Sequence, residues 1–400
     1  MRTVTSILAI ALCAVATGVG QTSTRRSLLV DDAYVDRVRA QIATGDSGLK
    51  TALDTLEKDA AVALARKPVS VMDKGLAPPS GDKHDYMSQA PYWWPDPSKP
   101  DGRPYIRKDG VTNPEIRRIT DHDNLGRLCS DVAMLGLAYR LTRKPEHAAH
   151  AAQLARVWFL DPATRMNPHL KFGQGIPGIN DGRGIGIIET RGLPDLLDGL
   201  ALVGDSRAWT AGDEAGLQAW MQAFLTWLVE SDYGKDESKN GNNHETWYDV
   251  QVAALSYYTG QTDITRRTIE HARDAIAAQI QPDGRQPREL ERTKSWDYSA
   301  FNLRAFFNLA TIGERIGVDL WNYQTADGRG LRKALDYMVG VAAGDRPWTY
   351  EQIGGVRNSE IQWLLRKAAV AWKSNEYSKL AMRQASGISR IDLTLPTFVP

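Results

Sequence analysis

Apolar residues recur every three or four positions along most of the chain after Asp31, which is the spacing that one face of an α-helix requires. We find no alternation of strand and helix, and no period-two run long enough to predict a strand. The pattern therefore predicts an all-α protein with helical regions at residues 33–65, 124–141, 145–159, 192–203, 213–230, 245–258, 263–280, 299–316, 331–343 and 359–372.

Two long segments without helical periodicity interrupt this pattern, residues 67–123 and 167–191. The first contains the run APYWWPDP at residues 90–97, whose prolines exclude a regular helix and whose aromatic residues argue against disorder. Helix pairs recur at intervals of roughly 40 to 55 residues, and such pairs stack into solenoids or close into rings. We therefore expect an α/α toroid, incomplete or closed, whose long loops form a cleft at one end.

The ends of the chain suggest export and a single catalytic domain. Residues 1–20 have the pattern of a secretory signal peptide, with Arg2 as the charged region, an apolar run at 7–19 and small residues near Gly20. The apolar run is too short to predict a membrane span. No clear linker divides residues 21–400, so we expect one domain, secreted or periplasmic, acting as a monomer.

Composition excludes several kinds of partner. The chain has 49 basic and 48 acidic residues without a block of like charge, so we expect neither nucleic acid nor a membrane surface as a partner. The seven histidines form no His-Glu-x-x-His motif and there is no cysteine cluster, so no metal or other cofactor is expected. Of the two cysteines, Cys13 belongs to the signal segment and Cys129 is expected in the core. The glycine run at 182–186 lacks a preceding strand, so nucleotide binding is not expected.

Two polar segments that precede predicted helices carry the candidate chemistry. The first, residues 242–248, reads NNHETWY, and the second, residues 292–298, reads RTKSWDY. Either segment alone fits a helix cap or solvated side chains. Together they provide an amide, an imidazole, a guanidinium and a phenol, a set that suits removal of a proton beside a carboxylate.

Further residues are candidates for binding a substrate. Arg183 and Arg191 flank the glycine run, and they would bind a carboxylate or else pair with Asp181 and Glu189. Four tryptophans and a tyrosine lie in loops or near predicted helix starts, where they would stack on sugar rings or else seal the ends of the toroid. These residues are Trp93, Trp94, Trp247, Trp296 and Tyr248.

The motif Asn242-Asn243-His244-x-x-Trp247, followed by Arg292 and Tyr298, resembles the alginate lyase family of polysaccharide lyases. Segments 92–95 and 167–174 are also similar, and the resemblance extends from about residue 86 to residue 315. It implies an α/α toroid in which Asn243 and Arg292 neutralise a substrate carboxylate, Tyr298 transfers protons, and His244 assists or acts as the base. At residues 245–246 and 296–297 the chain departs from the best-known alginate lyases. It is more similar to a side branch of the family that also includes glucuronan lyases.

The resemblance predicts an endo-acting lyase that cleaves β-1,4-linked uronate polymers by β-elimination, with mannuronate-rich alginate favoured over glucuronan. Because a free tyrosine has a pKa of about 10, we expect Arg292, Lys294 or a charged His244 to lower the pKa of Tyr298. Two alternatives remain open. One is a glycoside hydrolase that uses two carboxylates among Glu189, Glu245, Asp249 and Asp297. The other is a non-catalytic glycan-binding protein that uses the same aromatic residues.

Overall fold

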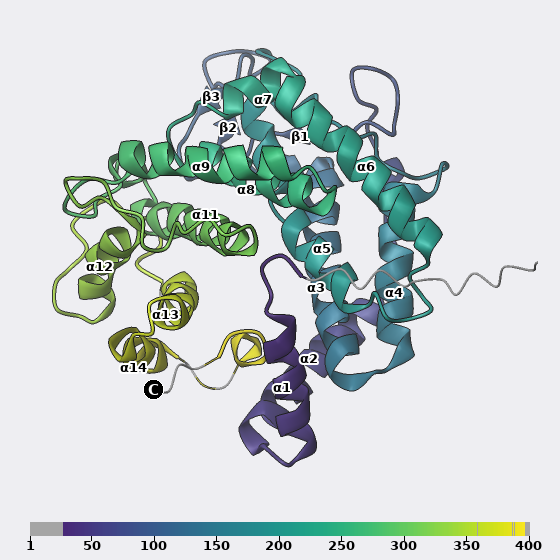
Figure 1. Ribbon diagram of the computed structural model, residues 1–400. Coiled ribbons are helices and arrows are strands. Elements are labelled where there is room, and N and C mark those ends of the chain that lie inside the picture. Colours follow the sequence, from purple (N-terminus) through teal and green to yellow (C-terminus); the bar gives the residue numbers. More distant parts are fainter. Residues whose placement is uncertain (1–26, 358, 386, 388, 397–400) are drawn as a thin grey trace, which may run out of the picture.

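The computed structural model describes residues 27–357, 359–385, 387 and 389–396, so the predicted signal segment and Cys13 lie outside the described residues. Helices arranged in a ring make up the molecule (Figure 1). The longer helices are α1 (Asp32–Ala43), α2 (Ser47–Leu64), α3 (Asp121–Thr142), α4 (Pro145–Ala155), α5 (Leu193–Leu202), α6 (Ala211–Glu230), α8 (Asn243–Tyr258), α9 (Thr262–Gln279), α11 (Ser295–Arg315), α12 (Leu331–Ala342), α13 (Ser359–Ala371) and α14 (Asn375–Gln384). Short helices are η1 (Val71–Asp73), η2 (Pro114–Arg118), η3 (Arg156–Leu160), η4 (Gly184–Thr190), α7 (Asp232–Glu237), α10 (Pro287–Leu290) and η5 (Arg390–Leu393).

The ring has an inner and an outer layer. Helices α3, α5, α8, α11 and α13 follow one another on the inside, while α4, α6, α9, α12 and α14 pack outside them (Figure 1). Helices α3 and α5 cross closely because both have glycine at the contact, and a Cβ atom at Gly136 would collide with the backbone of Gly199. The first and last helical segments that the structure describes meet where η5 packs against α2. The Tyr34 hydroxyl in α1 donates to the Asp392 carbonyl in η5 (2.9 Å).

Two small sheets tie the irregular segments together at one end of the ring. Strand β1 (Met87–Gln89) pairs in parallel with β4 (Phe172–Gly175), so the two long segments are joined to each other. Strand β2 (Trp93–Trp94) pairs with β3 (Ile106–Arg107) as an antiparallel hairpin. The toroid expected from the helical periodicity is confirmed, and strand β2, the adjoining loops and the N-terminal parts of α8 and α11 carry the predicted site residues.

The helix bounds differ from the prediction where caps come from distant residues. Helix α11 begins four residues earlier than predicted, because the Ser295 N–H donates to the Glu351 carbonyl (3.1 Å) and the Trp296 N–H to Gln352 Oε1 (2.9 Å). Helix α8 begins at Asn243, after Asn242 caps the His244 N–H. The predicted first helical region is two helices separated near Gly45, and α7, α10 and α14 were not predicted.

Cys129 is buried in the core as predicted, and burial raises the pKa of its thiol. Within the described ranges, no helix combines the length and apolar character needed to cross a membrane.

Candidate active site

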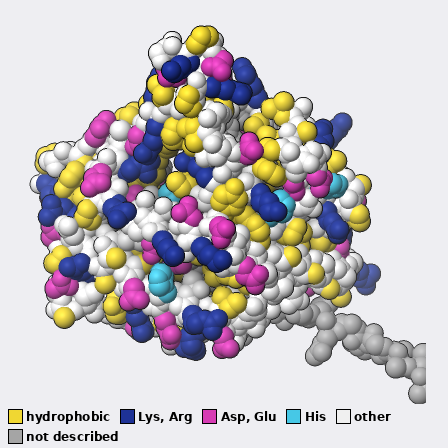
Figure 2. Space-filling view, turned by 90° about the horizontal axis from the view of Figure 1, so that it is seen from above, with side chains coloured by type: hydrophobic (Ala, Val, Ile, Leu, Met, Phe, Trp, Pro, Cys, Tyr) yellow, Lys and Arg dark blue, Asp and Glu magenta, His cyan; other side chains and the backbone are white. Residues whose placement is uncertain are grey.

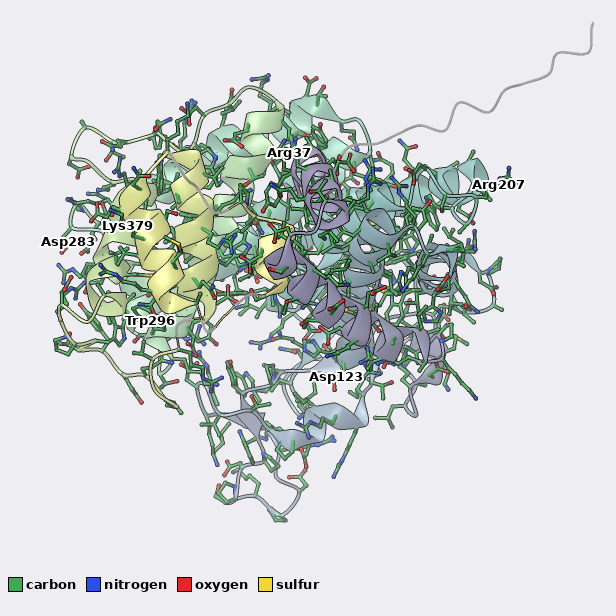
Figure 3. All side chains as sticks on the ribbon, turned by 90° about the horizontal axis from the view of Figure 1, so that it is seen from below. Arg37, Asp123, Arg207, Asp283, Trp296 and Lys379 are labelled. Carbon is green, nitrogen blue, oxygen red and sulfur yellow. The ribbon has the colours of Figure 1, made fainter. Side chains whose placement is uncertain are left out.

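A cavity of about 1020 Å³ opens at the end of the ring that carries the two small sheets. Seen from above, the surface is hollowed next to a projecting lobe, and lysine and arginine side chains gather around the hollow (Figure 2). Two lining residues, Asp123 and Trp296, lie well apart, so different elements form the two sides (Figure 3). The lining includes Tyr92, Trp93, His122, Arg183, Arg191, Asn243, His244, Arg292 and Tyr298.

Tyr298 lies in the first turn of α11, and its hydroxyl is 2.8 Å from the hydroxyl of Tyr92. The Arg292 guanidinium stacks on its ring, with Cζ 3.8 Å from the ring centroid. Burial raises the pKa of Tyr298 strongly and the contact with Tyr92 adds to this, whereas Arg292 acts in the lowering direction. The expected lowering of this pKa was therefore wrong, because desolvation of the phenolate outweighs the neighbouring cation.

Arg292 is held by an acid that the sequence analysis missed. Its Nε and Nη2 atoms donate to Asp109, at 3.1 Å to Oδ2 and 2.8 Å to Oδ1, and Thr293 also donates to Asp109. Burial opposes ionisation of Asp109, but its bonds and charge interaction with Arg292 outweigh burial and lower the pKa to about 2. Because Asp109 follows β3, this ion pair fastens the β2–β3 hairpin over the cavity.

His244 is oriented by a second missed acid, Glu237, which is 0% exposed. The His244 Nδ1–H donates to Glu237 Oε1 (2.8 Å), while the amide of Asn240 donates to Oε2 of the same carboxylate (2.6 Å). With Nδ1 engaged, Nε2 is the nitrogen that remains for contacts in the cavity. Glu237 escaped detection because it lies between the predicted helices at 213–230 and 245–258, where the structure forms the short helix α7.

Asn243 borders the cavity but is only 1% exposed. Its backbone N–H and its Nδ2 amide donate to the two oxygens of Glu289, at 2.7 and 2.8 Å. One amide hydrogen is therefore committed to Glu289, and only the other remains for a ligand. Its buried Oδ1 atom has no hydrogen-bond partner in the described structure.

The two arginines of the glycine run line the cavity and do not form the ion pairs considered above. Arg183 donates to the side chain and carbonyl of Gln174, at 2.9 and 3.2 Å. Arg191 donates to the Ile188 carbonyl (3.2 Å), and its Cζ lies 5.6 Å from the ring centroid of Phe301. Both guanidinium groups are thus available to an anionic ligand.

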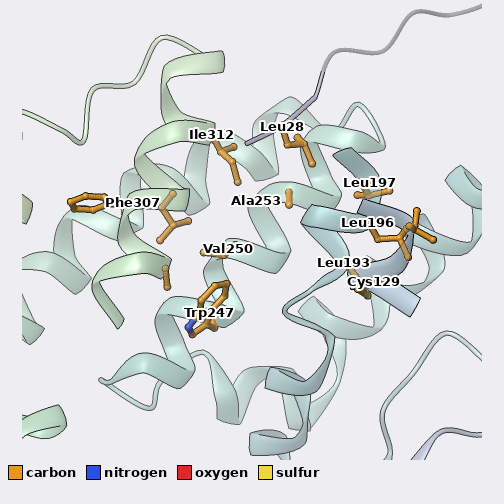
Figure 4. Packing of buried hydrophobic residues seen from close by; sticks show 14 of the residues in the cluster. Leu28, Cys129, Leu193, Leu196, Leu197, Trp247, Val250, Ala253, Phe307 and Ile312 are labelled. Carbon is orange, nitrogen blue, oxygen red and sulfur yellow. The ribbon is translucent and has the colours of Figure 1, made fainter. Parts of the chain in front are cut away.

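Only one of the five aromatic candidates lies in the cavity as an accessible ring. Trp93 lines it, whereas Trp94 donates to the Val111 carbonyl (2.9 Å) on the hairpin. The other three are packed inside the protein: Trp247 (5% exposed) lies 4.9 Å from Phe301, Tyr248 donates to the Leu228 carbonyl (3.0 Å), and Trp296 (0% exposed) packs on Trp348 and borders the cavity. Their role in binding substrate stays a prediction, which the burial of Trp247 and Tyr248 disfavours. Trp247 belongs to the cluster formed with Val250 and Ala253 (Figure 4).

A group of possible metal ligands lies on α8 and α9 rather than in the cavity lining. The sequence did not predict this group. Oxygen and nitrogen atoms of Glu245, Asp249 and His271 lie within 4.8 Å of one another. The Nδ1 atom of His271 is 3.3 Å from Asp249 Oδ2, and this contact raises the pKa of His271 to about 9. We interpret the group as an ion pair between two helices.

The comparisons with known proteins agree with this geometry. The family model for alginate lyase matches residues 70–348. The chain belongs to the alginate lyase family. The crystal structure of an alginate lyase from Bacteroides ovatus is similar to this chain, with 37% sequence identity and a TM-score of 0.88. The match covers 92% of this chain and 98% of that chain.

More distant structures share the fold alone. Alginate lyase A1-III from Sphingomonas species A1 is 16% identical, with a TM-score of 0.56 and coverage of 88% of this chain and 91% of that one. A variant of A1-III complexed with a tetrasaccharide is 15% identical, with the same coverage and a TM-score of 0.58. A comparison with curated proteins found no match. The family resemblance is confirmed, and the protein is a polysaccharide lyase.

Proposed function

We propose that this lyase cleaves β-1,4-linked uronate polymers internally by β-elimination, with mannuronate-rich alginate favoured over glucuronan. The observation that carries the proposal is the arrangement around Tyr298, whose phenol contacts Tyr92 and Arg292 within a cavity that also exposes His244. Export and a single domain over residues 21–400 remain proposals, supported by the pattern of residues 1–20 and by the lack of a clear linker. A monomeric state is also a proposal.

The reaction removes the hydrogen at C5 of a uronate and expels the glycosidic oxygen at C4. The carbanion that develops is stabilised when donors neutralise the adjacent carboxylate. Asp109 uses Nε and Nη2 of Arg292, so Nη1 keeps hydrogens that can be donated to a substrate carboxylate. The remaining amide hydrogen of Asn243 is the second donor in this proposal.

Tyr298 is proposed to carry the proton. Its raised pKa means that the phenol is protonated in the free enzyme, which suits donation to the departing oxygen. Its phenolate, the form that removes the C5 hydrogen, would be stabilised by the stacked Arg292, which acts to lower this pKa. His244, held by Glu237, is proposed to assist this transfer.

Stereochemistry favours mannuronate and glucuronate over guluronate as substrates, but it does not choose between mannuronate and glucuronate. In mannuronate and glucuronate the C5 hydrogen and the C4 oxygen lie on the same side of the ring, so one tyrosine can serve both. In guluronate they lie on opposite sides, and His244 would have to act as the base. Mannuronate and glucuronate differ at C2, which is remote from the bonds that change.

The test is incubation with purified polymannuronate, polyguluronate and glucuronan at matched concentration, followed by ultraviolet absorbance of the unsaturated product. We expect the fastest initial rate on polymannuronate. Fastest cleavage of polyguluronate would defeat the same-side mechanism, whereas fastest cleavage of glucuronan would change only the substrate order. Saturated products would instead support a hydrolase, for which Glu189 and Asp297 are the candidate carboxylates that line the cavity.

A further inference from the structure

A second imidazole, His122, lines the cavity and has no role in the elimination described above. It lies in the first turn of α3, and its Nδ1 atom is 3.4 Å from Glu189 Oε1 in η4. Glu189 is itself fixed, because the hydroxyls of Tyr86 and Ser88 donate to its Oε2 at 2.7 and 2.6 Å. A buried carboxylate thus lies behind His122, as Glu237 lies behind His244.

We propose that His122, positioned by Glu189 and accompanied by Arg191, binds the carboxylate of a uronate residue beside the one that reacts. The inference rests on the proposed function, because it assumes a polymer with a carboxylate on each sugar. It adds a binding subsite that contains no proton-transfer residue.

The geometry gives His122 one free side. Its Nδ1 atom is buried, whereas 41% of the side chain is exposed, so the edge of the ring that carries Nε2 faces the cavity. His122 belongs to the wall formed by α3 and η4, and Tyr298 to the wall formed by α11. In this proposal, His122 on one wall takes the carboxylate of one sugar while Tyr298 on the other wall serves the sugar that reacts.

The surrounding charges favour a protonated imidazole. The Glu189 carboxylate, 3.4 Å from Nδ1, raises the pKa of His122 most, burial opposes it, Arg191 acts in the lowering direction, and Asp123 in the raising direction, with a raised pKa as the net result. The pKa of Glu189 is lowered, since its bonds to His122, Ser88 and Tyr86 outweigh burial, so the acid is ionised at neutral pH. A protonated His122 presents an N–H donor toward the cavity, which a carboxylate would accept as a charge-assisted hydrogen bond.

The first experiment measures kcat and KM on polymannuronate from about pH 5.5 to about pH 9, a range that spans histidine titration. For the wild type, KM should rise with pH as His122 loses its proton. His122→Gln should raise KM about tenfold at the acidic end of the range, because one hydrogen bond to a charged group is lost. The variant's KM should no longer rise with pH, and its kcat should stay within about twofold of the wild-type value. Glu189→Gln should move the rise in KM to lower pH.

His271→Gln is the matched control, because His271 also pairs with a buried acid but lies outside the cavity lining. It should keep the wild-type profile. A His122→Gln variant with wild-type KM at every pH would overturn the proposal, and so would a loss confined to kcat.

A binding measurement separates this inference from the proposed function. Calorimetric titration with mannuronate oligomers at pH near 6, where histidine titrates, compares the Tyr298→Phe variant with double variants that also carry His122→Gln or His122→Asn. The double variants should bind about tenfold more weakly, because one hydrogen bond to a charged group is lost. Methyl-esterified oligomers should not distinguish the variants. Equal binding of the acidic oligomers would overturn the subsite, while absence of unsaturated product from any uronate polymer would overturn only the proposed function.

Discussion

Replacing Glu237 by glutamine tests whether the buried acid behind His244 matters for turnover. The wild-type carboxylate accepts two hydrogen bonds, one from His244 Nδ1 and one from the Asn240 amide. Glutamine has almost the same shape but only one oxygen, so its NH₂ group must face one of these two donors. Either His244 loses its fixed orientation or Asn240 loses its acceptor.

The size of the effect follows from the burial of the site. A hydrogen bond to a charged group contributes roughly 1.5–3 kcal/mol, and an unsatisfied buried donor costs about 1–3 kcal/mol. We therefore expect Glu237→Gln to lower the free energy of unfolding by about 2 kcal/mol. If the orienting bond acts on the transition state, kcat should fall by about tenfold to hundredfold, since about 1.4 kcal/mol corresponds to a factor of ten.

The assay combines urea unfolding with steady-state rates of unsaturated product formation. Glu270→Gln, on the exposed surface of α9, is the matched control and should leave both quantities near wild type. A folded Glu237→Gln variant with wild-type kcat and KM would refute the claim that Glu237 positions His244 for the reaction. A loss of stability alone would assign Glu237 a structural role.

Four further substitutions probe the cavity and the core. Tyr298→Phe should reduce turnover by about a hundredfold to ten-thousandfold in a folded protein, and near-normal rates would disprove its proton-transfer role. The pKa of Asp109 falls from 3.8 to about 2 in the folded protein, so its ionised form should stabilise the fold above about pH 4 and lose that effect as the pH falls toward 2. After discounting for solvent screening, we expect a contribution of about 1 kcal/mol to the free energy of unfolding. In acid unfolding, Asp109→Asn should therefore show a smaller pH dependence of stability than the wild type. Trp247→Ala should lower the free energy of unfolding, measured in urea, by about 3–5 kcal/mol. Trp93→Ala should chiefly raise KM. The reverse pattern would contradict the assignment of Trp247 to the core and of Trp93 to the cavity.

The helices were predictable because burial of one helix face leaves a local trace in the sequence. Positions three and four apart must both be apolar to reach the same core, so α6 and most of α9 appear at nearly their observed bounds. The start of α11 left no such trace, since its cap includes the carbonyl of Glu351, which is 56 residues away from Ser295. Chain segments that distant meet only in the folded protein.

The same limit applies to the candidate site. Sequence similarity indicated Arg292, but Asp109 lies 183 residues from it, within an ordinary Lys-Asp-Gly turn. The placement of Trp247 was more accessible to sequence reasoning. It precedes Val250 and Ala254 by three and seven positions, which is the spacing of a buried helix face and argues for the core rather than for sugar stacking.

The electrostatics of the cavity explain why composition carried no sign of an anionic substrate. Three cavity groups that can donate to a carboxylate are each backed by an acid: Arg292 by Asp109, His244 by Glu237 and His122 by Glu189. Each acid offsets part of this positive charge at long range, so cationic groups gather around the cavity in a chain whose net charge is only +1. At short range the acid fixes the direction of the remaining N–H groups, which reduces the entropy lost when a ligand is bound. Such a cavity recognises the spacing of carboxylates along a polymer more than its total charge, so selection among uronate polymers depends on where these donors point.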